Sequence, residues 1–204
     1  MRIVQITGIF SLFLIGFSSW IPFQVESQVL DKGRSVKDHY LLSVPEFHFE
    51  LTFPVKKSYV IPTTTVQDGI NLYHYIAQVQ NINDENLAYQ IDYNHLDSID
   101  FGSVKQMFDD QRDYVMTELI SRLKEFDSAS EVVIESEEEI DLYGIPGRYF
   151  ISRMRIPSID DILIYHKWYY TDGILYRLTI MTRDPKFPNK SALVFFDSFK
   201  ILKK

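Results

Sequence analysis

The amino-acid sequence predicts an α+β domain in which helices cover an antiparallel β-sheet. Segments of alternating polar and apolar residues, typical of half-buried strands, recur from residue 46 onward. One long amphipathic helical pattern interrupts them, and a short one follows the last strand. The order of strands, helix, four meandering strands and helix favours an α/β/α layered domain built on one antiparallel sheet.

Three strands are predicted before the long helix. They cover Phe47–Phe53, Leu72–Val79 and Leu87–Tyr93. Residues 55–70 contain Pro62 and Asp68-Gly69, so we expect a loop or an irregular edge there. Residues 28–45 are weakly patterned, and we expect them to form an N-terminal arm.

The long helix is predicted over residues 104–126. Ser103 and Gln106 fit a capping box, in which each side chain satisfies the backbone N–H of the other residue. Apolar side chains then share one face at helical spacing: Val104, Met107, Phe108, Val115, Leu119, Leu123 and Phe126.

Four strands and a short helix complete the predicted domain. The strands are Glu131–Leu142, Gly147–Ile156, Ile162–Tyr170 and Ile174–Thr182. Asp172-Gly173 joins the last two and is a strong hairpin signal. Asn189 is expected to cap a helix whose apolar residues are Ala192, Phe195, Phe196 and Phe199. Ile201-Leu202 adds a last short strand.

The chain begins with a segment typical of a secretory signal. Residues 3–25 carry no charged side chain and follow Arg2, and Val25-Glu26-Ser27 offers a cleavage site that leaves Gln28 as the mature N-terminus. The predicted organisation is a signal peptide (1–27), a mature N-terminal arm (28–45) and one α+β domain (46–204). This predicts export to the periplasm or the extracellular space. The alternative is an uncleaved anchor, because roughly 20 apolar residues can span a bilayer.

Composition and missing motifs exclude several functions. Without any cysteine, the chain has no disulfide, thiolate nucleophile or Cys-type metal site. A net charge of −7 without a basic run argues against a nucleic-acid partner. There is no P-loop, dinucleotide fingerprint or G-x-S-x-G elbow. The five histidines form no i,i+2 or i,i+4 pair. We therefore predict no cofactor, no metal and no catalytic residue.

Structural motifs frame most of the mature chain. They are Phe53-Pro54, Tyr143–Arg148, Trp168–Leu178 and Phe195–Ile201. Together they resemble the Mog1/PsbP-like superfamily, in particular its exported bacterial branches. The resemblance implies the layered α+β fold and a non-catalytic accessory or assembly role. It transfers no metal-binding or complex-binding residue, because none of those that photosynthetic members use is identifiable here.

The candidate binding residues lie on neighbouring predicted strands: Arg153, Arg155, Lys167, Tyr169 and Arg177. The basic members suggest an anion-binding or partner-binding patch, and the alternative is cross-strand pairing with acids. Tyr169 belongs to an aromatic cluster that suggests a ligand groove, and the alternative is sheet packing. By alternation, the acidic run places Glu135, Glu137, Glu139 and Asp141 on one solvated face and Glu138 on the other.

Three functions are compatible with these observations. The preferred one is a non-enzymatic exported accessory protein that binds another protein through the sheet face or an exposed edge. The first alternative is a binder of a small apolar or anionic ligand in an aromatic groove between sheet and helix. The least favoured is a hydrolase with carboxylate or histidine catalysis, an idea that depends on acids and histidines meeting on one face.

Overall fold

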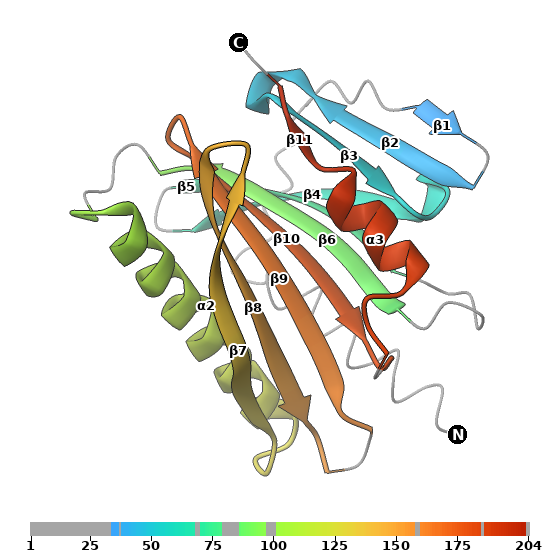
Figure 1. The fold of residues 1–204 in the computed structure, drawn as a ribbon. Coiled ribbons are helices and arrows are strands. Elements are labelled where there is room, and N and C mark those ends of the chain that lie inside the picture. Colours follow the sequence, from blue (N-terminus) through green and yellow to red (C-terminus); the bar gives the residue numbers. More distant parts are fainter. Residues whose placement is uncertain are drawn as a thin grey trace.

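The computed structural model describes residues 34–36, 38–67, 70–78, 86–96, 101–157, 160–184 and 186–202 (Figure 1). The predicted signal peptide and its cleavage site lie outside these residues. So does most of the turn-rich connection near residue 83. Within the described ranges, no helix is both long and apolar enough to cross a membrane.

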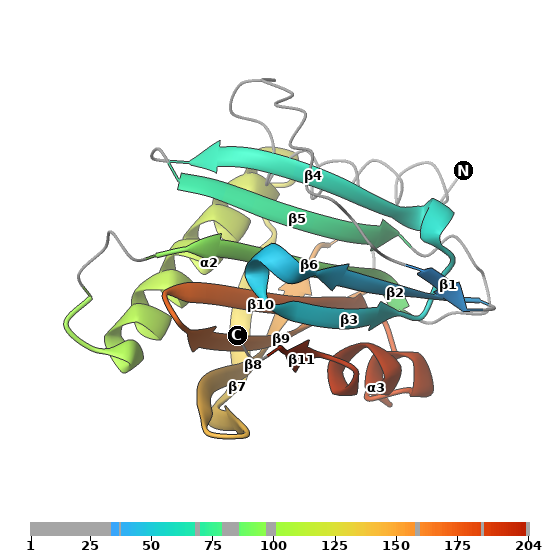
Figure 2. The same cartoon turned by 90° about the horizontal axis from the view of Figure 1, so that it is seen from above.

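Two antiparallel sheets make up most of the described structure. The large sheet has the strand order β4 (Val60–Gln67), β5 (Ile70–Gln78), β6 (Asn86–His95), β10 (Ile174–Thr182), β9 (Ile162–Thr171), β8 (Ile145–Arg155) and β7 (Glu131–Leu142). The small sheet has the order β1 (Arg34–Val36), β2 (His39–Val44), β3 (Phe49–Phe53) and β11 (Lys200–Ile201). The small sheet lies across β6 and β10 in the view from above (Figure 2), where Phe49 contacts Tyr93 and Tyr176.

Two α-helices accompany the sheets. Helix α2 (Val104–Phe126) begins where the sequence predicted, and the Ser103 hydroxyl accepts a hydrogen bond from the Gln106 backbone N–H at 3.1 Å. The reciprocal half of the capping box is not formed, because the Ser103 backbone N–H donates to the Phe101 carbonyl at 2.8 Å and the Gln106 side chain donates to Asp110 one turn later. Helix α3 (Lys190–Asp197) has the predicted Asn189 cap. Short 3₁₀ turns cover Pro45–Phe47 and Lys57–Tyr59.

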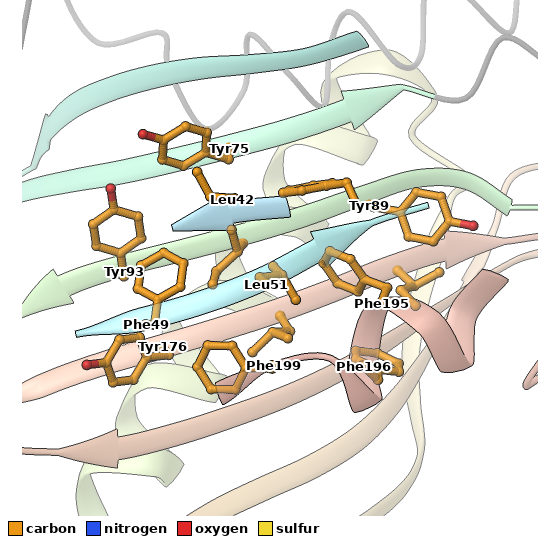
Figure 3. Packing of buried hydrophobic residues seen from close by; sticks show 14 of the residues in the cluster. Leu42, Phe49, Leu51, Tyr75, Tyr89, Tyr93, Tyr176, Phe195, Phe196 and Phe199 are labelled. Carbon is orange, nitrogen blue, oxygen red and sulfur yellow. The ribbon is translucent and has the colours of Figure 1, made fainter. Parts of the chain in front are cut away.

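The two faces of the large sheet are covered differently. One face packs against α2 through apolar side chains such as Leu119, Phe150 and Trp168. The other face packs against the small sheet and α3 in an aromatic core (Figure 3), where Tyr89 and Phe195 are completely buried. The mostly antiparallel α+β architecture is therefore as predicted. Cover by helices alone is not confirmed, because a second sheet forms much of one layer.

The first third of the chain departs most from the sequence prediction. Within the expected N-terminal arm, His39–Val44 forms β2, and its alternate residues Tyr40, Leu42 and Val44 are buried. Alternation was obscured because Leu41 is also apolar. The segment expected as a loop or irregular edge contains β4, an edge strand of the large sheet, where Pro62 is tolerated.

A β-bulge in β7 changes the expected facing of the acidic run. The pairing register with β8 shifts between Ile134 and Ser136. As a result, Glu135 bonds Arg153, whereas Glu137 bonds Arg148 near α2. The prediction that Glu135 and Glu137 share one face is wrong, because the extra residue of a bulge interrupts strict alternation.

Candidate functional site

The large sheet separates the five predicted binding residues between its two faces. Lys167 and Tyr169 alternate with Trp168 on β9 and face the small sheet and α3, whereas Trp168 faces α2. Arg177 pairs directly with Trp168 across the strands, and directly paired residues share a face. Arg177 therefore lies on the α2 side, away from Lys167 and Tyr169.

Arg153 and Arg155 form ion pairs with neighbouring acids. The Arg153 guanidinium bonds Glu135 on β7 and lies 3.2 Å from an Asp161 carboxylate oxygen. Arg155 lies 3.7 Å from Glu131. This is the cross-strand pairing that was the alternative to an anion-binding patch.

Lys167 and Tyr169 do meet in a groove, which we call the α3 groove. Its volume is about 380 Å³. Strands β7 to β9, the loop before α3 and α3 itself supply its lining residues: Glu138, Ile140, Asp141, Tyr149, Lys167, Tyr169, Phe187, Pro188, Leu193, Phe196 and Asp197. The sequence indicated its aromatic character, but only the strand register brings these residues together.

Strand register explains why the sheet is hollowed here. Ile140, Gly147 and Tyr169 occupy directly paired positions on β7, β8 and β9. Gly147 has no side chain, and the Tyr169 ring lies so close that a Cβ on Gly147 would be 2.7 Å from its Cδ1 atom. The Tyr169 ring also stacks on Phe199 at a centroid distance of 5.6 Å. The tyrosine therefore lies across β8 and forms part of the groove lining.

The charges of the groove do not suit an anion. The Lys167 ammonium lies 4.8 Å from the Phe196 ring centre. Burial lowers the pKa of Lys167, and the nearby Asp197 and Glu138 act in the opposite direction. Together with Asp141, the lining contains three carboxylates and one ammonium. The groove thus has an apolar aromatic lining with a net negative charge.

A row of polar side chains crosses the other face of the large sheet, beneath α2. It contains His74, Asp92, Arg177, Trp168 and Arg148, which are directly paired from β5 to β8. All five are buried, with exposures between 1% and 7%. We call these residues the α2 row.

Hydrogen bonds join one end of the α2 row. His74 Nδ1 lies 2.6 Å from Asp92 Oδ1, and His74 Nε2 lies 2.8 Å from the Thr65 hydroxyl. Gln90 donates to the same Asp92 oxygen at 2.6 Å. Burial alone would raise the pKa of Asp92, but His74, Arg177 and Gln90 lower it. Asp92 is therefore held as a carboxylate.

Sequence reasoning missed the contact between His74 and Asp92. It tested the histidines for metal-binding pairs at i,i+2 or i,i+4 spacing. The signal that could have found the pair is the alternation of β5 and β6, but the pairing register needed to align them is set by the tertiary structure. Among the described residues, no group of three or more acids and histidines could hold a metal ion.

The meeting of His74 and Asp92 bears on the hydrolase alternative. Thr65, His74 and Asp92 follow the order hydroxyl, imidazole and carboxylate used in nucleophilic catalysis. One histidine and one acid thus meet on one face of the large sheet. The His74 side chain is only 2% exposed, however, so the imidazole has little contact with solvent.

Comparison with known proteins identifies the fold. No family model matches the sequence, and no curated protein does. The solution structure of cyanobacterial PsbP (CyanoP) from Synechocystis sp. PCC 6803 is similar to 82% of this chain and 94% of that one, with a TM-score of 0.53 and 11% identity. The protein of unknown function PA94 from Pseudomonas aeruginosa is similar over 65% and 85% of the two chains, with a TM-score of 0.34 and 11% identity. The first comparison supports the PsbP-like fold that the resemblance implied, and at this identity it concerns the fold alone.

Proposed function

We propose that this chain is an exported, non-enzymatic accessory domain that binds a basic segment of a partner protein in the α3 groove. The observation that carries the proposal is the groove itself, with its aromatic lining and three carboxylates. Aromatic side chains provide contact area, and opposite charge selects and orients a partner. The groove narrows the expected docking through a sheet face or an exposed edge to one place, where β7 to β9 of the large sheet meet α3.

An exposed tyrosine beside the groove supports a protein partner. Tyr143 is 96% exposed at the tip of the β7–β8 hairpin, two residues after the groove residue Asp141. Its φ of 56° is a left-handed conformation that is uncommon for a tyrosine. Tyrosines frequently anchor protein interfaces, because they combine a large apolar ring with a polar tip. Leu193 of α3, 44% exposed, extends the apolar surface along the groove.

Site-specific crosslinking in the producing cell tests the proposal. A photoreactive phenylalanine analogue replaces Tyr143, and the matched control carries it at Tyr59, which is 45% exposed and precedes β4 at the opposite edge of the large sheet. We expect one crosslinked protein at position 143 and none at position 59. Equal crosslinking at both positions, or recovery of no partner at position 143, would contradict the proposal.

Charge variants test the part assigned to the groove. With the captured partner, Glu138→Gln and Asp197→Asn should weaken binding, and higher salt should reduce the affinity of the unaltered protein. Glu125→Gln is the control, because Glu125 is exposed on α2 beyond the other face of the sheet. If instead native mass spectrometry shows a small molecule retained in the groove, ligand binding replaces protein binding as the function.

Two further measurements test export and the absence of catalysis. N-terminal sequencing of the protein from the cell envelope or medium should begin at Gln28, whereas an intact Met1 in the membrane fraction would indicate the anchor. The purified protein should not hydrolyse simple esters. Turnover that is lost in Thr65→Ala would show that the chain is an enzyme.

A further inference from the structure

The α2 row contains a buried arginine without a bonded partner. Arg177 is 7% exposed, and its Nε atom is fully enclosed without a hydrogen-bond acceptor. No hydrogen bond or ion pair joins its guanidinium to any other residue in the described part of the chain. A buried, uncompensated charge is strongly destabilising in general. An acceptor next to this guanidinium, from a ligand or from water, would offset that cost.

The acid paired with Arg177 on the neighbouring strand does not fill that role. Asp92 pairs with Arg177 in the strand register, and its charge favours the protonated arginine. Its Oδ1 atom, however, already lies 2.6 Å from each of His74 and Gln90. No Asp92 oxygen comes within ion-pair distance of Arg177 among the contacts of the described residues. The carboxylate and the guanidinium thus attract each other without touching.

Two more buried donors continue the α2 row from Arg177. The Trp168 indole N–H and the Arg148 Nε–H each lack an acceptor, although other atoms of Arg148 bond Asp109 and Glu137. The three residues occupy successive paired positions on β10, β9 and β8. Three adjacent residues on one face thus carry N–H groups that no described protein atom accepts, and these donors suit an acceptor-rich group.

Tyr114 is an α2 residue on the same side of the sheet as Arg177. It is 40% exposed, and it is close enough to interact electrostatically with Arg177. Of the guanidinium nitrogens of Arg177, only Nε is fully enclosed without an acceptor, so a ligand approaches the group from the side of its two outer nitrogens.

We propose that Arg177 binds a small oxyanion, a carboxylate or phosphate group, between α2 and the large sheet. A guanidinium binds such groups through paired N–H donors, and the neighbouring Trp168 N–H supplies a further donor. The site lies on the opposite face of the sheet from the α3 groove. It is independent of the proposed protein-binding function, so either can fail without the other.

A fluorescence titration tests the site directly. The sequence contains two tryptophans, Trp20 and Trp168, so Trp20→Phe in the full chain leaves Trp168 as the reporter. Inorganic phosphate and acetate are titrated separately at constant ionic strength, which distinguishes the two anions from each other and from screening. We expect saturable fluorescence changes with at least one of them. Absence of saturation with both anions would overturn the proposal and leave water as the acceptor.

Variants assign the binding to Arg177. Arg177→Met should weaken anion affinity by about 10- to 100-fold, the loss typical of a charged hydrogen-bonded contact. Arg155→Met is the control, because Arg155 is 53% exposed and pairs with Glu131. At an anion concentration of about 100 Kd, the Tm of the unaltered protein should rise by about 5–10 °C. Unchanged affinity in Arg177→Met would overturn the assignment.

The sign of the stability change separates binding from a merely structural role. Without the anion, Arg177→Met removes an unpaired buried charge and should unfold at the same or a higher temperature than the unaltered protein. With saturating anion the order should reverse. If Arg177→Met is less stable under both conditions by the same amount, the arginine stabilises the fold without a ligand and the proposal is wrong.

Discussion

Replacing Gly147 by alanine should strain the sheet at the bottom of the α3 groove. The added Cβ would lie 2.6 Å from the Trp168 carbonyl oxygen and 2.7 Å from the Tyr169 ring. The carbonyl belongs to β9, which is paired with β8, and cannot move without disturbing that pairing; the ring is also held by stacking on Phe199. Inserting one methyl group into such a site costs about 1–3 kcal/mol.

The expected net loss in the free energy of unfolding is smaller than the steric cost of the added methyl group. Alanine also restricts the unfolded chain, which stabilises a protein by about 0.4–1 kcal/mol relative to glycine. We therefore expect Gly147→Ala to lower the free energy of unfolding by about 1–2 kcal/mol. For a domain of this size, that corresponds to a fall in Tm of about 2–8 °C. Urea unfolding followed by Trp168 fluorescence measures the loss, because Trp168 is adjacent to the clash.

Gly144 provides a control in the same hairpin. It has a φ of +89°, and a Cβ added to it would meet no atom within 4 Å, so only its backbone conformation demands glycine. Gly144→Asn should therefore cost less than Gly144→Ala, since asparagine tolerates left-handed conformations. At Gly147 the order should be the opposite, because asparagine is larger. An unchanged or higher urea midpoint for Gly147→Ala would refute the steric argument.

Two other substitutions test the connection between the sheets and the buried polar face beneath α2. The Tyr176 hydroxyl donates to the Phe47 carbonyl at 2.8 Å in a buried site, so Tyr176→Phe should lower the free energy of unfolding by about 1–3 kcal/mol. Tyr143→Phe is the control and should be neutral, because Tyr143 is 96% exposed. Equal effects of the two substitutions would contradict the stabilising role of this hydrogen bond. Burial lowers the pKa of His166 from 6.5 to about 3, with Asp92 opposing and Arg177 reinforcing the shift. Between these pH values the unfolded chain binds a proton that the folded one does not, so stability is lost as the pH falls from 6.5 toward 3. Over that pH window, the free energy of unfolding of the unaltered protein should fall by about 1.4 kcal/mol per pH unit relative to that of His166→Gln, as measured by urea titrations. Parallel pH profiles of the two proteins would show that His166 is not buried as a neutral base.

Sequence signals within a segment, such as caps, turns and periodicity, correctly predicted several helices and strands. Helix α2 and strands β7 and β10 begin and end at the predicted residues, because a Ser cap, a Gly-containing turn and regular alternation mark their bounds. The two-residue hairpin turn at Asp172-Gly173 has positive φ at both residues, as Asp-Gly predicts. The resemblance also led to the fold that the structural comparison supports, on the motifs Phe53-Pro54, Tyr143–Arg148, Trp168–Leu178 and Phe195–Ile201.

Local patterns failed where a distant partner decides the structure. Strand β2 was missed because its burial depends on β3 and on the core around Phe195. The side of the sheet on which Glu135 lies depends on a β-bulge, and the residues of β7 carry no local signal that predicts the bulge. The basic candidates Arg153, Arg155, Lys167 and Arg177 were predicted to form one patch, yet Arg177 faces α2 whereas Lys167 faces α3.

The sequence by itself determined the order and type of most elements, the absence of thiol chemistry and the acidic character of the chain, because these follow from residue identity and short-range periodicity. Only the tertiary structure decided which side chains meet. Alternation places a residue on one of two faces, but the register between strands selects its neighbours, and register is fixed by packing over the whole sheet. The strand register therefore determines both the lining of the α3 groove and the position of Arg177 without a bonded partner among the described residues.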